Sequence, residues 1–262
     1  MSQMLNFLDQ VASKIDTHKD FDGVIAEFTA AKIYDDIKDK IVIEAGCSTG
    51  VVTERIIDVA KELYIVEGSS VYANIVFEKF QNRLAGMTIS FFSDFHPIKR
   101  AEVVLLLNVL HHFENPVGEL INMKDWLCDD GIMIITVPNM ESLHRRLGVA
   151  SGLTTSVSET SERNELFKQY GRYTKDILFD QVEAAGFEVV DFTGFFLKPF
   201  NHDVMIRLSL PSNVLMGLNK LGESFPELAS QILVDSIQKL KKLLIALLKV
   251  LFRKLHLSAE NM

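Results

Sequence analysis

The chain has few cysteines and no excess of positive charge, and each shortage excludes a class of protein. Only two of its 262 residues are cysteines, Cys47 and Cys128, too few for the disulfide framework of a small secreted domain. The formal net charge of −8 argues against non-specific binding of nucleic acid by the whole molecule. Residues 1–10 lack a basic start followed by an apolar run, so we expect no signal peptide and a cytoplasmic location.

Short apolar runs alternate with helical patterns along most of the chain, without an internal repeat or a low-complexity linker. The hydrophobic content of 48% supports a sizeable core. After a helical region at 1–38, strands are predicted at 41–44, 63–67, 88–92, 103–107 and 132–137, with helices between them at 51–60, 71–83 and 117–127. A further helix is predicted at 176–185, and two more strands at 187–196 and 231–237. This order predicts an α/β fold with parallel strands and right-handed helical crossovers.

The most informative segment is 41–50, which reads IVIEAGCSTG. An apolar strand ends in the acid Glu44, and a turn of small residues leads to a helical pattern near Val51, as in a strand–loop–helix unit that binds a nucleotide-like ligand. Gly46 and Gly50 lack a Cβ atom, so the turn can take positive φ and a ligand can lie against the main chain. The carboxylate of Glu44 favours a cationic or hydroxyl-bearing ligand.

Two segments carry a resemblance to a known family. The spacing E-x-G-x-x-x-G, unlike the G-x-G-x-x-G of dinucleotide enzymes, resembles motif I of the class I S-adenosylmethionine-dependent methyltransferases. Residues 108–116, which read NVLHHFENP, are similar to a segment at the carboxyl edge of the fourth strand in many small-molecule members. The resemblance implies a Rossmann-like, seven-stranded, mostly parallel sheet with helices on both faces and its last strand inserted antiparallel. Ser48 stands where the family often has glycine, and it would be strained if that position requires positive φ.

The same resemblance implies that the chain binds S-adenosylmethionine. Glu44 and Asn108 would hold its methionine end, Glu67 its ribose and Asp94 its adenine. Glu67 closes the strand at 63–67, where a carboxylate can accept both ribose hydroxyls, although it could also be a solvated loop acid. Phe95 could cover the adenine ring or belong to the core. The other predicted cofactor-binding residues are Gly46, Cys47, Gly50 and Ser93.

His111 and His112 are candidates for a general base, because an unperturbed imidazole titrates near neutral pH. We favour His112, and the alternative is that both rings satisfy local backbone groups. A hydroxyl acceptor needs a base whereas a neutral amine does not, so the paired histidines favour oxygen as the methylated atom. Asn115 and Pro116 suit the start of the next helix, so part of this motif is structural.

The long segment at 139–175 follows the fifth strand, at the sheet edge where acceptor specificity is built. Residues 138–148, with the pattern P-N-x-x-S-L-H-R-R-L-G, and residues 169–174, which read QYGRYT, resemble segments of a bacterial subgroup of small-molecule methyltransferases. Gly171 lacks the side chain of the usual neighbouring histidine. Arginine suits phosphate or carboxylate, so we predict a sugar or another anionic biosynthetic intermediate as the acceptor. A solvated helix face is the alternative. The predicted acceptor-binding residues are His144, Arg145, Arg172 and Tyr173.

We therefore predict a methyltransferase domain at 1–238, with helices at 1–38 and an acceptor-side insertion at 139–175, and no metal. After methyl transfer the cofactor would be released as S-adenosylhomocysteine. The alternatives are a small-molecule N-methyltransferase, a dinucleotide-dependent oxidoreductase and a non-catalytic cofactor-binding scaffold. A nucleic-acid methyltransferase is disfavoured because no second basic domain is present.

Residues 239–262 predict a basic amphipathic helix. Within 239–257 six lysines and arginines accompany repeated leucines, and no acid is present. Such a helix could lie on an anionic membrane surface, pack against a second copy of the chain or fold back on its own acidic domain.

Liposome flotation of the full chain and of a chain that ends at Gln238 separates these alternatives. Membrane binding predicts that only the full chain floats with anionic vesicles, because only it carries the basic leucine-rich segment. If both proteins stay in the soluble fraction, the membrane alternative is rejected.

Overall fold

A computed structural model describes residues 2–13 and 16–239 of the protein. Its strands form one twisted sheet whose five parallel members are β1 to β5, while β7 is antiparallel to both of its neighbours, β5 and β6. The predicted seven-stranded, mostly parallel sheet is confirmed. In spatial order the strands are β3 (Gly86–Ile89), β2 (Glu62–Glu67), β1 (Ile41–Ala45), β4 (Ala101–Leu107), β5 (Leu127–Pro138), β7 (Gln231–Gln238) and β6 (Phe187–Phe195).

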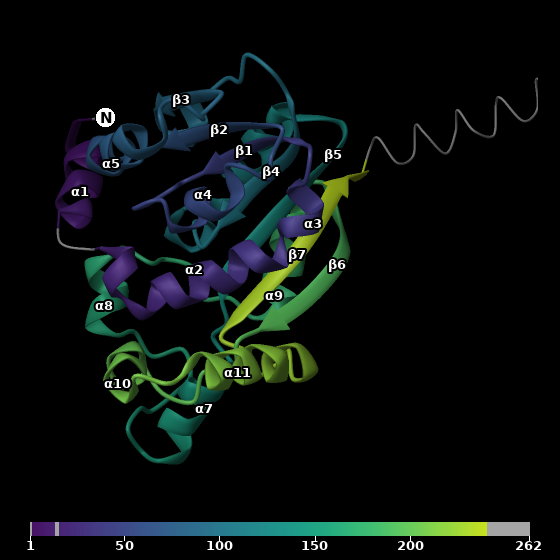
Figure 1. Ribbon diagram of the computed structural model, residues 1–262. Coiled ribbons are helices and arrows are strands. Elements are labelled where there is room, and N and C mark those ends of the chain that lie inside the picture. Colours follow the sequence, from purple (N-terminus) through teal and green to yellow (C-terminus); the bar gives the residue numbers. More distant parts are fainter. Residues whose placement is uncertain (1, 14–15, 240–262) are drawn as a thin grey trace, which may run out of the picture.

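Helices cover both faces of the sheet (Figure 1). One face packs against α2 (Phe21–Lys32), α4 (Val51–Ile56) and α5 (Ser70–Phe80). The other packs against α6 (Pro116–Asn122), the 3-10 helix η4 (Met123–Trp126) and α9 (Lys175–Ala184). Successive strand residues point to opposite faces, so a strand buried on both sides is apolar throughout.

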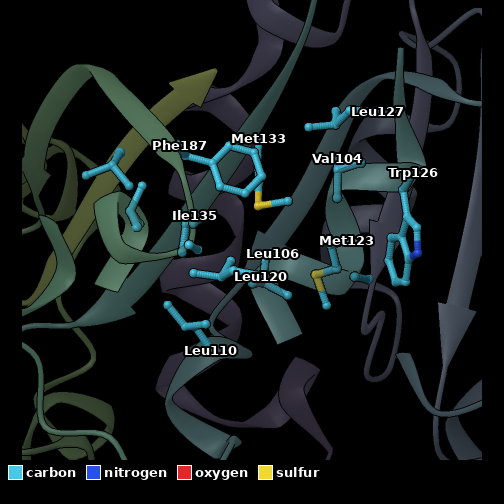
Figure 2. Packing of buried hydrophobic residues seen from close by; sticks show 14 of the residues in the cluster. Val104, Leu106, Leu110, Leu120, Met123, Trp126, Leu127, Met133, Ile135 and Phe187 are labelled. Carbon is cyan, nitrogen blue, oxygen red and sulfur yellow. The ribbon is translucent and has the colours of Figure 1, made fainter. Parts of the chain in front are cut away.

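Between the sheet and the second group of helices lies a hydrophobic core that contains Trp126 and Met133 (Figure 2). Leu106 of β4 and Leu120 of α6 are fully buried there, and Phe187 at the start of β6 closes the cluster. Each fully buried large side chain of this kind contributes roughly 1.5–3 kcal/mol to folding. Leu110, directly before the two histidines, also belongs to this cluster, so the core anchors the histidine segment that follows β4.

The carboxyl ends of six strands meet at one edge of the sheet. Because β7 is antiparallel to both β5 and β6, β6 points in the same direction as β1 to β5. The loop after β6 therefore reaches the edge at which β1, β2 and β4 also end. Ligands of open α/β sheets bind at this edge.

Several predicted boundaries differ from the structure. The helical region predicted at 1–38 divides into α1 (Ser2–Ala12), η1 (Thr17–Lys19), α2 and α3 (Tyr34–Ile37), since Asp20 caps α2 with its side chain and starts a new helix. The third strand ends at Ile89 instead of residue 92, and Phe92–Asp94 forms the 3-10 helix η2. The insertion contains α7 (Leu143–Ala150) and α8 (Glu162–Leu166), while α10 (His202–Leu208) and α11 (Ser212–Ser224) separate β6 from β7.

None of the helices in the described residues is long and apolar enough to cross a membrane. Of the predicted C-terminal amphipathic helix, residues 240–262 lie outside the described residues. The boundary between the domain and this segment, and the role of the segment, stay predictions.

Helix α11 lies close to the loop after β6 at Gly222. A Cβ atom on Gly222 would lie 2.3 Å from the backbone nitrogen of Phe196, whereas a Cβ atom on Gly217 of the same helix would meet nothing within 4 Å. Gly222→Ala should therefore destabilise the protein by about 1–3 kcal/mol, although alanine is the better helix former. Gly217→Ala should stabilise it by about 0.5–1 kcal/mol. Urea unfolding measures both, and equal stabilisation by the two changes would contradict the close approach.

Candidate functional site

A cavity of about 1370 Å³ lies at the carboxyl edge of the sheet. Its walls come from the segments that follow β1 to β6, together with α1, α2 and the insertion. Pockets for one small ligand typically have volumes of about 300–1,000 Å³. This cavity therefore has room for two small molecules side by side.

The turn after β1 depends on left-handed backbone at three positions. Gly46 and Gly50 both have φ of 82°, and a Cβ atom on Gly46 would lie 2.8 Å from Val109 Cγ2. Ser48 also has positive φ, 49°, as the comparison with the family's glycine anticipated. Left-handed backbone costs an ordinary residue roughly 1–2 kcal/mol, and the hydroxyl of Ser48 hydrogen-bonds Thr17 at 2.9 Å. Gly46 and Ser48 line the cavity, whereas Gly50 lies at the start of α4.

Glu67 closes this turn from the end of β2. Its Oε2 accepts the backbone N–H groups of Cys47, at 2.9 Å, and Ser48, at 3.3 Å, while its Oε1 accepts the N–H of Ser69 at 2.8 Å. Burial raises the pKa of Glu67, and the three N–H groups oppose that rise. A carboxylate oxygen has two lone pairs, so Oε1 retains one for a ligand hydroxyl. The geometry supports contact with one ribose hydroxyl at Oε1 more directly than the predicted grip on both.

Glu44 is the second buried carboxyl group on the cavity wall, with 2% of its surface exposed. Its Oε2 accepts the hydroxyl of Thr53 at 2.8 Å. Burial raises the pKa of Glu44 to about 8, and the negative charge of Glu67 adds to the rise. Burial and these two acids also raise the pKa of the Cys47 thiol. A cation bound beside Glu44 would offset this cost.

The adenine-binding prediction is only partly matched by the geometry. Ser93 lines the cavity, together with Phe91 and Phe92. Asp94 and Phe95 do not, because β3 ends early and the η2 turn directs Asp94 to solvent. The Phe95 ring packs edge-on against Trp126 with centroids 4.9 Å apart, which is the core alternative.

Asn108, at the end of β4, takes left-handed backbone with φ of 55° and lines the cavity. Its N–H donates to the backbone oxygen of Thr136 at 3.0 Å. Its side-chain Oδ1 is buried and has no hydrogen-bond partner among the residues that the structure describes. Buried polar atoms are usually hydrogen-bonded, so this oxygen can accept a hydrogen bond from a bound ligand.

His111 and His112 follow on the 3-10 helix η3 (Leu110–His112), with ring centroids 4.2 Å apart. His112 Nδ1 lies 3.0 Å from the carbonyl oxygen of Phe167, and because a carbonyl only accepts, Nδ1 is the donor. In neutral His112 the Nε2 atom therefore carries the lone pair. Burial lowers the pKa of His112 and lowers that of His111 further, so both rings are neutral at pH 7. Both line the cavity.

The four predicted acceptor residues separate into two pairs. His144 and Arg145 of α7 line the cavity, and Arg145 Nη1 donates to the carbonyl oxygens of Val157 and Glu159. Arg172 and Tyr173 do not line it. Tyr173 is buried in the core, and its hydroxyl donates to Gln181 Oε1 at 2.8 Å.

The backbone explains both the position of Arg172 and the glycine before it. Arg172 donates to the carbonyl oxygens of Gln169 and Gly171 beside it. A Cβ atom on Gly171 would lie 2.4 Å from the Tyr173 ring and 3.0 Å from the Cα atom of His111. A histidine cannot fit at residue 171 in this arrangement.

Sequence reasoning missed part of the cavity wall. Phe7 and Leu8 of α1 line it, and α1 is held in place by Asp9, which accepts hydroxyl hydrogen bonds from Ser69 at 2.7 Å and Ser70 at 2.8 Å. The amphipathic pattern of α1 predicts a helix but not where that helix docks.

The loop after β6 and the start of α2 also contribute to the wall. Lys198 and His202 lie there, and Asp22 faces His202 with 3.4 Å between Oδ1 and Nε2. Asp20, Asp22 and His202 together offer three ligand atoms within 4.8 Å of one another. This arrangement is compatible with a metal ion and equally with an ion pair. Neither element carries a motif that sequence analysis could recognise.

Comparison with known proteins identifies related sequences and folds. Residues 18–191 match a family described as a methyltransferase domain. No curated protein sequence matched the chain.

Three solved structures share the fold at low sequence identity. Magnesium protoporphyrin IX methyltransferase from Synechocystis PCC 6803, solved with bound SAH, has a TM-score of 0.54 and 14% identity over 82% of this chain and 83% of its own. The N-methyltransferase NodS from Bradyrhizobium japonicum WM9, also with SAH, has a TM-score of 0.50 and 10% identity over 80% and 83%. The cyclase SpnF has a TM-score of 0.55 and 10% identity over 80% of each chain. At these identities the likeness establishes the fold alone.

The protonation of Glu44 predicts a pH-dependent stability. The folded protein holds a proton on Glu44 up to about pH 8, whereas the unfolded carboxyl releases it near pH 4.5. Its stabilising contribution is therefore complete below pH 4.5 and is lost as the pH rises to 8. Between pH 5 and pH 8 the wild type should lose on the order of 2–4 kcal/mol of unfolding free energy relative to Glu44→Gln.

Urea unfolding at both pH values measures this difference. Glu78→Gln, a change at an exposed glutamate of α5, is the matched control and should follow the wild type. Parallel pH profiles for the wild type and Glu44→Gln would show that Glu44 is ionised in the folded protein.

Proposed function

The chain belongs to the methyltransferase family that its residues 18–191 match, and we propose that it transfers a methyl group from S-adenosylmethionine to an oxygen atom of a small molecule. One observation carries the proposal. A single cavity is lined by two buried carboxyl groups, by a glycine turn and by a histidine whose Nε2 atom can accept a proton.

The part of the cavity wall that contains Glu44 and Glu67 fits the positive charge of the cofactor. The side chain of Glu44 and the unsatisfied Oδ1 of Asn108 would hold the ammonium of its methionine end. Glu67 would accept one ribose hydroxyl at Oε1, and the adenine would lie against the backbone near Ser93. When bound, the cofactor supplies an electrophilic methyl group on a sulfonium.

The protein then has to align the acceptor, exclude water and remove one proton. His112 Nε2 takes the proton of the acceptor hydroxyl as that oxygen attacks the methyl group. The hydrogen bond from Nδ1 to the Phe167 carbonyl keeps the ring oriented during this transfer. Its lowered pKa keeps the base neutral near pH 7.

The proposed methyl acceptor is a sugar or other anionic biosynthetic intermediate. Arg145 on the cavity wall supports an anionic acceptor, and the negative net charge of the chain disfavours nucleic acid. Peripheral membrane contact or dimerisation through 239–257 stays a prediction.

Two alternatives keep support. N-methylation needs no base, and a structure with this fold is an N-methyltransferase. A cyclase also has this fold, so a cofactor-binding protein with another activity, or with none, is the second alternative. The dinucleotide oxidoreductase loses its support because the chain belongs to the methyltransferase family.

Transfer of a labelled methyl group tests the proposed reaction. The protein is incubated with methyl-labelled S-adenosylmethionine and fractionated metabolites of the source cell, and label must enter a small molecule. Tight cofactor binding with no transfer to any fraction would favour the non-catalytic alternative.

His112→Gln should lower kcat at least about tenfold while leaving the affinity for S-adenosylhomocysteine nearly unchanged. Glutamine can still donate to the Phe167 carbonyl, but its side chain cannot accept the acceptor's proton as a base. His96→Gln, at an exposed histidine outside the cavity lining, is the control. Undiminished turnover of His112→Gln would leave His111, or no base at all, as the better account.

A further inference from the structure

The segment that follows α8 is bonded to the histidine segment. The carbonyl oxygen of Phe167 lies 3.0 Å from His112 Nδ1, and the N–H of Gly171 donates to the carbonyl oxygen of His111 at 2.9 Å. These two hydrogen bonds join residues 167–171 to the 3-10 helix η3. The orientation of the proposed base therefore depends on a loop that is distant from it in the sequence.

Helix α8 ends in a Schellman motif, and Lys168 occupies the left-handed position of that motif. The N–H of Gln169 donates to the carbonyl oxygen of Asn164 at 2.9 Å, and the N–H of Lys168 donates to that of Glu165 at 3.1 Å. Lys168 has φ of 47°. Glycine is the usual residue at this position, because left-handed backbone is unfavourable for a residue with a Cβ atom. Since the motif itself gains nothing from lysine, the side chain of Lys168 is the part that calls for a role.

This side chain contacts the N-terminal helix α1. Its Nζ atom lies 4.1 Å from the centroid of the Phe7 ring, within the range of a cation–π interaction. Phe7 and Lys168 both line the cavity, so the contact is part of its wall. The contact therefore joins the first helix of the chain to the loop that holds His112.

Helix α1 is itself fixed on the cofactor side of the cavity. Asp9 accepts the hydroxyl group of Ser69 at 2.7 Å, and the N–H of Ser69 donates to Glu67 Oε1 at 2.8 Å. These hydrogen bonds join α1 to the acid that would bind the ribose. The Phe7 ring therefore has a fixed position from which to bind Lys168.

We propose that the contact between Lys168 and Phe7 positions the base His112. This inference rests on the proposed function. The carbonyl of Phe167 and the nitrogen of Lys168 belong to one planar peptide group, so the backbone of Lys168 sets the direction of that carbonyl. By holding Lys168, the Phe7 ring holds the carbonyl against the imidazole.

The direction of this carbonyl decides which nitrogen of His112 carries the proton. Because a carbonyl only accepts, a hydrogen bond at Nδ1 leaves Nε2 with its lone pair. Without that hydrogen bond either nitrogen can carry the proton, and the tautomer protonated at Nε2 cannot take one from the methyl acceptor. Lys168 and Phe7 are thus positioning residues that act through the ring of His112.

Nitrogen NMR of the histidine rings tests this inference without a methyl acceptor. In the wild type saturated with S-adenosylhomocysteine at pH 7, His112 should be protonated at Nδ1 alone, and its signals are assigned from their loss in His112→Gln. Lys168→Met and Phe7→Leu should both populate the tautomer protonated at Nε2. Lys168→Arg should keep the wild-type tautomer, because it keeps a positive charge over the ring.

Lys175→Met is the matched control. Lys175 is an exposed lysine outside the cavity lining, and its Nζ atom lies 4.8 Å from the centroid of the Phe192 ring. Its substitution removes a similar interaction and should leave the tautomer of His112 unchanged. An unchanged tautomer in Lys168→Met and Phe7→Leu would overturn the inference and leave His112 in place as the base.

Turnover in the labelled-methyl assay supplies the second test. Lys168→Met should lower kcat about three- to tenfold with nearly unchanged KM for S-adenosylmethionine, because the base is misoriented while the cofactor site stays intact. Unchanged affinity for S-adenosylhomocysteine is the check on folding. The double variant with Phe7→Leu should lose little more than either single variant, since both changes remove the same contact. Additive losses would contradict the proposed contact.

Lys168→Gly separates the side chain from the backbone. Glycine suits the left-handed position, so this change relieves strain while it removes the contact with Phe7. We expect the same loss of kcat as in Lys168→Met. Full turnover of Lys168→Gly would show that the lysine side chain is not needed, and would overturn the inference.

Discussion

The carboxylate of Glu67 holds together the part of the molecule on which the site depends. It accepts backbone N–H groups from Cys47 and Ser48, in the turn after β1, and from Ser69, at the start of α5. These hydrogen bonds fix a turn that contains left-handed backbone, and they do so at the cost of burying an acid beside Glu44. Two neighbouring buried carboxyl groups resist joint ionisation, so a cationic ligand at this place stabilises the charged form of both.

The sheet then places titratable side chains of the cavity along the edge at which its parallel strands end. The two acids lie at the ends of β1 and β2, the neutral histidines after β4 and Lys198 after β6. A cofactor with a sulfonium would meet the two acids, and His112, the proposed proton acceptor, follows β4, the strand beside β1. The antiparallel β7 makes this order possible, because it turns β6 so that its end faces the same side.

The cofactor half of the site could be predicted because its constraints are local. The turn with Gly46, and the acid that ends each of the first two strands, follow from a few adjacent residues. Asp94 and Phe95 could not be placed, because the third strand ends three residues early and the helical turn that follows changes their direction. Lys198 could not be found at all, since its position depends on pairing between strands that are distant in sequence. The left-handed backbone at Ser48 was anticipated from the family's glycine, but the hydroxyl contact with Thr17 was not.

Calorimetric titration of the purified chain with S-adenosylmethionine at pH 7, in two buffers with different enthalpies of ionisation, tests the central claim most directly. The account predicts saturable binding with release of protons, because Glu44 must ionise to face the bound cation. Binding without proton release would contradict the role of Glu44. Failure of both S-adenosylmethionine and S-adenosylhomocysteine to bind would contradict the account as a whole.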